Sequence, residues 1–258
     1  HRHTSIPSRA LRWLCAAETI QTYTKKLSEE LQQLAVSHFH HPEALVRFSE
    51  QRHDVDLVAK LVEERVREWT TRTAHIVSQN WMQRVSDRFL TTSYAIDEKQ
   101  FYQFDLADPW ALAATQGWGH SLDFIDHHMT HASTRDRLVY EICVKIVKAI
   151  EDLVFAKKQY SGFGALQLDK DVRVLRQFFT ERTEHPVREV FSRISAIVTL
   201  LLIDRPAEAN DLFASHVPST EASATLSTVS FTVDEKRRIV GLRVDFDPQV
   251  IVNSVTMQ

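Results

Sequence analysis

Apolar side chains recur every three or four residues along most of this chain, the spacing that places them on one face of an α-helix. The pattern runs from residue 7 to 42, where a proline closes it, and from 54 to about 90 without a glycine or proline. The first run predicts one helix, and the second predicts one very long helix or two nearly collinear helices. Between residues 133 and 158 the separation into an apolar face and a charged face is clearest.

Further helices are expected near residue 109 and in the last third of the chain. Asp108 and Pro109 form a typical helix start, and we expect the helix that follows to be interrupted at "GWG", residues 117 to 119. The stretch from 215 to 230 is rich in Ser and Thr without a period, so we expect a loop there. The remaining helices are predicted around "DKDVRVLRQFF", over 186 to 203, from 206 to about 215, and around "VDEKRRIVGLR" and "DPQVIVNSV".

No segment shows the alternation that a β-strand requires, so the predicted fold class is all-α, built from elongated, stacked antiparallel helical bundles. We expect two of them: a longer first bundle over residues 1–130 and a smaller C-terminal bundle over 131–258. This boundary depends on "GWG" and on the polar run "DHHMTHASTRD" that follows it.

The composition agrees with long helices, because the 258 residues include only 5 Gly and 7 Pro. A net charge of -3 gives no positive field for a phosphate backbone, so nucleic acid is not an expected partner. Two cysteines are too few for a disulfide framework and fit a reducing compartment.

The most apolar run, 194 to 203, is shorter than the roughly 18 residues that a transmembrane helix needs, so we expect any membrane contact to be peripheral. The chain begins with His rather than Met, so we expect a fragment of a longer protein.

Two of the five glycines stand in "YSGFGALQLDKDV", with the G-x-G spacing of a phosphate-binding loop. A dinucleotide fingerprint needs a preceding strand and a third glycine, but Gln167 occupies that position and a helix is expected before it. We therefore interpret Gly162 and Gly164 as a helix stop and turn, with Asp169 to Asp171 entering the next exposed helical turn.

Thirteen histidines suggest a metal site, and the strongest case is "SLDFIDHHMTH". There Asp123, His127 and His131 are four residues apart, a spacing that places three ligands on one helical face and leaves an open position. Their alternative role is that of solvated residues at a helix end, and no general base accompanies them as in H-E-x-x-H. An all-α metal-dependent hydrolase is therefore one functional hypothesis. The hypothesis favoured below assigns the chain no metal ligand, no cofactor and no catalytic residue.

Arg193 is expected at the margin of an apolar stripe on the helix over 186 to 203, and therefore partly buried. A guanidinium in such a position needs a carboxylate, because burying it unpaired costs several kcal/mol. Glu235, one turn before Ile239, is the acidic residue best placed to supply it. We predict a structural ion pair between Arg193 and Glu235 that anchors the final helices.

Four segments, in this order, resemble the C-terminal part of subunit 4 of the conserved oligomeric Golgi complex, a vesicle-tethering assembly. They are "ADPW" at 107 to 110, "FGALQLDKDVRVL" at 163 to 175, "VREVFSRISAIVTLL" at 187 to 201 and "RRIVGLRVDFDPQVI" at 237 to 251. The chain departs from the family in three respects. Gly164-Ala165 stands where the family has paired glycines, the 215 to 230 loop looks longer, and the histidine cluster has no counterpart.

The resemblance implies a non-enzymatic helical subunit that lies on the cytosolic face of Golgi membranes without spanning them. It implies sister subunits of the complex and SNARE-side trafficking proteins as partners in retrograde intra-Golgi transport. A subunit of a related tether, such as an exocyst-type complex, is a further alternative.

Overall fold

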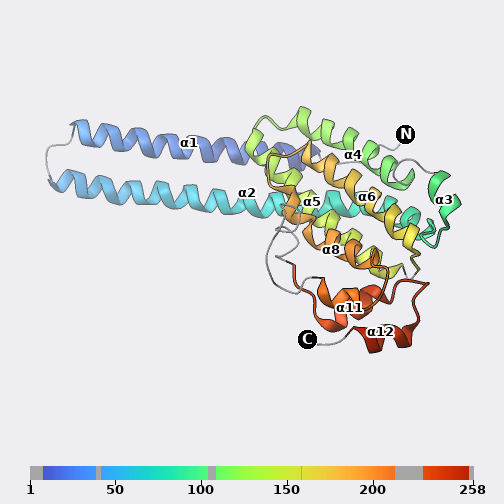
Figure 1. The fold of residues 1–258 in the computed structure, drawn as a ribbon. Helices are drawn as coiled ribbons and strands as arrows, with labels where there is room; N and C mark the ends of the chain where they lie inside the picture. Colours follow the sequence, from blue (N-terminus) through green and yellow to red (C-terminus); the bar gives the residue numbers. More distant parts are fainter. Residues whose placement is uncertain (1–7, 39–41, 104–108, 158, 213–228, 256–258) are drawn as a thin grey trace. The chain divides into compact units, whose positions relative to one another are not determined.

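The computed structural model describes residues 8–38, 42–103, 109–157, 159–212 and 229–255, and within them the fold is all-α, as predicted (Figure 1). Most of the predicted loop over 215 to 230 lies outside the described residues. The helices are α1 Ser8–His38, α2 Pro42–Thr91, α3 Glu98–Gln103, α4 Pro109–His128, α5 Ala132–Ala156, α6 Gly162–Thr180, α7 Val187–Val190, α8 Ser192–Leu201, α9 Glu208–Asp211, α11 Val233–Val240 and α12 Pro248–Ser254.

Several helix limits differ from the sequence-based expectation. Pro42 is the first residue of α2 rather than the end of a helix, as its fixed φ and missing N–H allow at a first turn. The second apolar run forms one helix of 50 residues. The expected break at residues 117 to 119 is wrong, because α4 continues through both glycines and Trp118 between them is buried. The helix expected over 186 to 203 is divided at Phe191 into α7 and α8.

The later helices begin at residues whose side chains cap them. Thr232 and Glu235 form a reciprocal capping box at the start of α11, in which each side chain bonds the other residue's backbone N–H. Asp247 accepts a hydrogen bond from the backbone N–H of Gln249 at the start of α12. These caps satisfy N–H groups that have no partner inside the helix.

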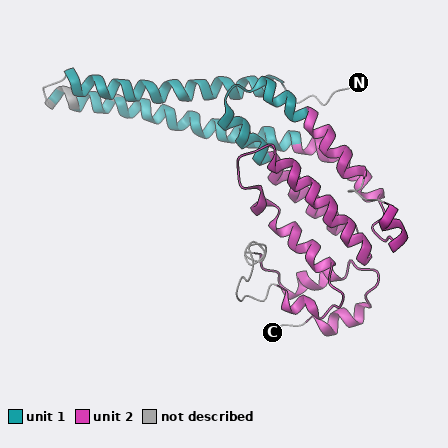
Figure 2. Ribbon diagram, turned by 45° about the horizontal axis from the view of Figure 1, so that its top comes forward, with its two compact units in different colours: residues 1–77, 121–141 teal, residues 78–120, 142–258 magenta. Residues whose placement is uncertain are grey.

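The chain divides into two compact units that are both discontinuous in sequence (Figure 2). Unit 1 comprises residues 1–77 and 121–141, and unit 2 comprises 78–120 and 142–258. The divisions fall within α2, α4 and α5. The expected boundary between residues 130 and 131 concerns folding domains and stays a prediction.

Unit 1 contains α1 running antiparallel to the first part of α2, as both ribbon views show. Residues 121–141 contact α1 near its start: Cys15 Sγ lies 3.5 Å from the carbonyl oxygen of His128, and Ser133 donates a hydrogen bond of 2.8 Å to Glu18. Farther along α1, Ser28 donates a hydrogen bond of 2.7 Å to Asp56 of α2. This contact and the ribbon views place α1 and the first part of α2 side by side.

Unit 2 contains a core of aromatic side chains around α4 and α6. The rings of Trp81 and Trp118 are stacked, with centroids 5.5 Å apart, and Phe179 lies 6.1 Å from Trp118. In this unit three segments also meet through backbone hydrogen bonds outside any helix. Tyr160 lies between Tyr94 and Arg243, and both contacts are isolated parallel β-bridges. These bridges connect residues far apart in sequence at the start of α6.

Candidate functional site

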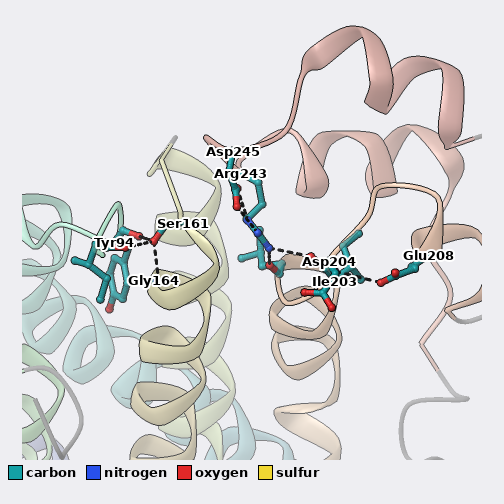
Figure 3. Close-up of polar contacts among 10 residues, drawn as sticks. Tyr94, Ser161, Gly164, Ile203, Asp204, Glu208, Arg243 and Asp245 are labelled. Atoms are coloured by element: carbon teal, nitrogen blue, oxygen red, sulfur yellow. Dashed lines mark hydrogen bonds and ion pairs between the residues drawn. The ribbon is translucent and has the colours of Figure 1, made fainter. Parts of the chain in front are cut away.

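The two glycines of the G-x-G motif lie in the first turn of α6, so their interpretation as a helix stop is wrong. Ser161 caps this helix: its hydroxyl donates to the carbonyl of Ile96 (2.6 Å) and accepts from the backbone N–H of Gly164 (3.1 Å). Its backbone N–H donates to the carbonyl of Tyr94 (Figure 3). A Cβ on Gly164 would overlap that carbonyl group, coming within 2.6 Å of its carbon. The glycine is therefore required by close backbone approach, not by a phosphate.

Asp171 lies in the core instead of the exposed turn that the sequence suggested, and it is fully buried. The hydroxyl of Tyr94 donates to one carboxylate oxygen of Asp171 and accepts a hydrogen bond of 2.8 Å from the indole N–H of Trp110. Tyr160, also fully buried, has a pKa raised by burial and, less strongly, by the negative charge of Asp171. Buried polar groups of this kind fix one arrangement of helices, because each is costly without its partner.

Arg243 holds the C-terminal end of α8. Its Nε and Nη2 donate to the two carboxylate oxygens of Asp245 at 2.7 and 2.6 Å, in the forked geometry that guanidinium and carboxylate favour. Its Nη1 donates to the carbonyls of Leu201 and Ile203 (Figure 3). A cation at this position satisfies carbonyls that lack partners within the helix and is favoured by the helix dipole. Only 5% of the Arg243 side chain is exposed.

Arg193 lies between two carboxylates. Its Nη2 is 2.6 Å from Glu235 Oε1, and its Nε is 3.8 Å from Glu151 Oε2. The side chains of Arg193 and Glu235 are 40% and 38% exposed, whereas Glu151 is only 6% exposed. Burial raises the pKa of Glu151, while Lys148 and Arg193 lower it. The pKa of Glu235 is lowered mainly by the backbone N–H of Thr232, and then by Arg193. The anchoring role of this pair stays a prediction.

The histidine cluster does not assemble as the metal hypothesis required. The helix α4 ends at His128, and His131 beyond it lies 3.1 Å from Thr19 Oγ1 and 3.9 Å from Glu18 Oε1, on α1. Asp123 and His127 are exposed on α4 itself. Within the described residues, no group of three or more His, Cys, Asp or Glu side chains is placed to hold a metal ion. The four-residue spacing failed as a signal because the helix ends too early.

No local pattern in the sequence indicated the roles of Arg243, Tyr94 or Asp171. Arg243 and Asp245 are two residues apart, so their pairing could have been suspected from spacing alone. The contact between Tyr94 and Asp171 joins residues 77 positions apart and has no local signal. Trp110, Asp171, Arg193 and Arg243 come from the four segments that carry the family resemblance, one residue from each. All four belong to unit 2 and hold its helices and turns in place.

These contacts define unit 2 as a helical scaffold, in which the polar side chains discussed above join one helix to another. The chain belongs to the family described as "Conserved oligomeric Golgi complex subunit 4, C-terminal", whose profile matches residues 10–238.

The chain is also similar to individual curated proteins, all called "Conserved oligomeric Golgi complex subunit 4". It is 30% identical to that of Arabidopsis thaliana over 65% of this chain and 21% of the relative. The identity is 24% to that of Mus musculus, over 89% of this chain and 28% of the relative. With Dictyostelium discoideum it is 26%, over 66% of this chain and 18% of the relative. The chain therefore spans less than a third of each relative. Within the described residues, no helix has both the length and the apolar content that a membrane crossing requires.

Proposed function

We propose that this chain is the C-terminal part of a Golgi tethering-complex subunit that acts through protein contacts and has no enzymatic activity. The match of the family profile over residues 10–238 carries this proposal. The buried contacts of Tyr94, Asp171 and Arg243 support it, because their donors and acceptors serve to hold helices together. On this proposal, function resides in the surfaces that the rigid helices present.

The partners are sister subunits of the same complex, together with SNARE-side trafficking proteins, in retrograde intra-Golgi transport. The protein acts on the cytosolic face of Golgi membranes and is held there peripherally, through the complex. The name of the relatives supports the sister subunits as partners, since a complex subunit has sister subunits. The SNARE-side partners, the transport step and the peripheral position on the membrane follow from the resemblance described above.

Affinity purification of the tagged protein, expressed from its own gene in its own cells, tests the proposal. We expect the other subunits of the Golgi complex to co-purify in stoichiometric amounts. A matched control is Gly164→Leu, which places a large side chain against the backbone at Tyr94 and should reduce recovery through loss of folded protein. Recovery of exocyst-type subunits, or of no partner at all, would contradict the proposal.

A further inference from the structure

The helix pair α1–α2 of unit 1 carries large apolar side chains on one face. On α1 they recur every seven residues and are each between 49% and 55% exposed: Trp13, Ile20, Leu27 and Leu34. On α2 they have the same spacing and are also partly exposed: Val55, Val62, Trp69 and Ile76. A seven-residue apolar repeat is the pattern by which one helix packs against another.

The two rows lie side by side. The rings of Trp13 and Trp69 are in edge-to-face contact, with centroids 6.4 Å apart. Because the helices are antiparallel, each step of seven residues forward in α1 matches a step of seven back in α2. This register brings Leu27 opposite Val55, and the hydrogen bond between Ser28 and Asp56 joins the two helices close to this level.

Toward the C-terminal end of α1, small buried side chains include Ser28 and Ala35 on α1 and Ala59 on α2. The larger apolar side chains of both rows therefore stay partly exposed beside the seam between the two helices instead of filling it, and we call the strip between the two rows the groove. At one end the groove opens into a hollow of about 470 Å³ lined by Trp13, Trp69, Ile76, Ala10, Arg72 and Thr73. This is the arrangement of a helical bundle that lacks another helix.

The length of the relatives suggests where an occupant of the groove could come from. The matched family profile describes the C-terminal region of the subunit, and the alignment covers only 28% of the mouse protein. In a full-length member most of the chain therefore precedes the matched region. That region begins at residue 10, and Ala10 itself lines the hollow. A preceding segment is thus held near the groove by a covalent link, which gives it a high effective concentration there.

We propose that, in the full-length subunit, a helix of the preceding chain packs into the groove between α1 and α2. This proposal rests on the proposed function as the C-terminal part of that subunit. The row on α1, from Trp13 to Leu34, spans about 32 Å of helix at 1.5 Å per residue. The occupant is therefore a helix of about 21 residues with its own seven-residue apolar repeat. An acidic residue at the hollow end is favoured by Arg72, the cationic side chain of its lining.

Photo-crosslinking in the protein expressed from its own gene tests this proposal. Leu27 is replaced by the photoreactive residue p-benzoylphenylalanine, and Lys26, exposed on the side of α1 away from the groove, is replaced in a matched control. Leu34, one repeat farther along, gives a second site should the first variant fold poorly. Chains labelled with heavy and light isotopes are mixed before irradiation, so that crosslinks within a chain differ in mass from those between copies.

We expect position 27 to crosslink to a peptide that precedes residue 10 of the same chain, at least five times more often than position 26 does. Crosslinks between heavy and light chains would assign the groove to a second copy, and crosslinks to another subunit would assign it to a partner. Either result, or equal yields at the two positions, would overturn the proposal. Co-purified subunits are scored in the same sample, so failure of the proposed function is seen separately.

Discussion

Tyr94 and Asp171, 77 residues apart in sequence, share a hydrogen bond inside the core of unit 2. The same tyrosine hydroxyl accepts from Trp110, and the backbone carbonyl of Tyr94 receives the N–H of Ser161. One residue between α2 and α3 thus contacts the start of α4, the start of α6 and a buried carboxylate. Its substitution is expected to disturb several helices at once.

Tyr94→Phe removes the hydroxyl but retains the ring. It should lower the free energy of unfolding by about 2 kcal/mol, because Asp171 loses a donor and Trp110 an acceptor where water cannot replace them. Urea denaturation followed by circular dichroism measures the change. Tyr102→Phe is the control: this ring is exposed, and the free energy should change by less than about 0.5 kcal/mol. Equal effects of the two substitutions would contradict the role of the Tyr94 hydroxyl.

Gly164→Ala should destabilise the protein by about 3 kcal/mol, because the added methyl group meets the backbone of Tyr94 and one of the two segments must move. Gly117→Ala is a matched change within α4, where an added Cβ has no heavy atom within 4 Å. It should stabilise by up to about 1 kcal/mol through helix propensity. Thermal unfolding of both variants gives the comparison, and an equal response at the two positions would show that α6 does not approach Tyr94 closely.

Arg243→Met should destabilise the protein by about 3 kcal/mol, because carbonyls at the end of α8 and the carboxylate of Asp245 lose a shared donor. Arg243→Lys should recover only part of this, since an ammonium group cannot reproduce the fork. Arg205→Met, at a side chain that is 84% exposed, is the control and should be nearly neutral. Denaturant titration distinguishes the three. Full rescue by lysine would show that charge alone matters at this position.

The contribution of Asp245 should depend on pH. Hydrogen bonds from Arg243 hold the pKa of Asp245 below its ordinary value of 3.8, so the folded state keeps the carboxylate charged to lower pH than the unfolded state does. The stability from this pair is therefore complete above about pH 5, where the carboxylate is ionised in both states, and is lost as the pH falls through the folded pKa. Urea midpoints of the wild type and Asp245→Asn should converge below that pH. In an Arg243→Met background the convergence should disappear, and a gap that widens in acid would contradict this assignment.

Arg193→Ala should cost about 2 kcal/mol and Glu235→Gln about 0.5 kcal/mol. The first change takes a cation from the buried Glu151, and the second only weakens a half-exposed pair in which water screens the charges. Glutamine retains an oxygen that can accept from Thr232 in the capping box. Denaturation measures the energies, and hydrogen exchange should show faster opening of α11 in Arg193→Ala. An unchanged exchange rate in residues 233–240 would remove the anchoring role.

The sequence by itself determined the helical class and the position of most helices, because amphipathic periodicity and capping residues are local signals. Long amphipathic patterns predicted α1, α2 and α5, and the segment "DPQVIVNSV" predicted α12. The resemblance carried by four short segments indicated the family that the profile match established. Arg193 and Glu235, which amphipathic geometry suggested as a pair, lie 2.6 Å apart, and the structural role of this pair stays a prediction.

Tertiary structure alone decided what the glycines and the buried polar residues do. Gly164 is required because the backbone of Tyr94 lies against it. Tyr94 is 67 residues before Ser161, the residue that caps α6, so no local pattern encodes this approach. Asp171 looked exposed because Asp usually is, yet Tyr94 satisfies it in the core. The histidine spacing indicated a site that the end of α4 prevents, with His131 contacting Thr19 instead. Such contacts depend on which segments meet after folding. The free-energy cost of burying a polar group depends on its hydrogen-bond partners, and here these partners are distant in sequence.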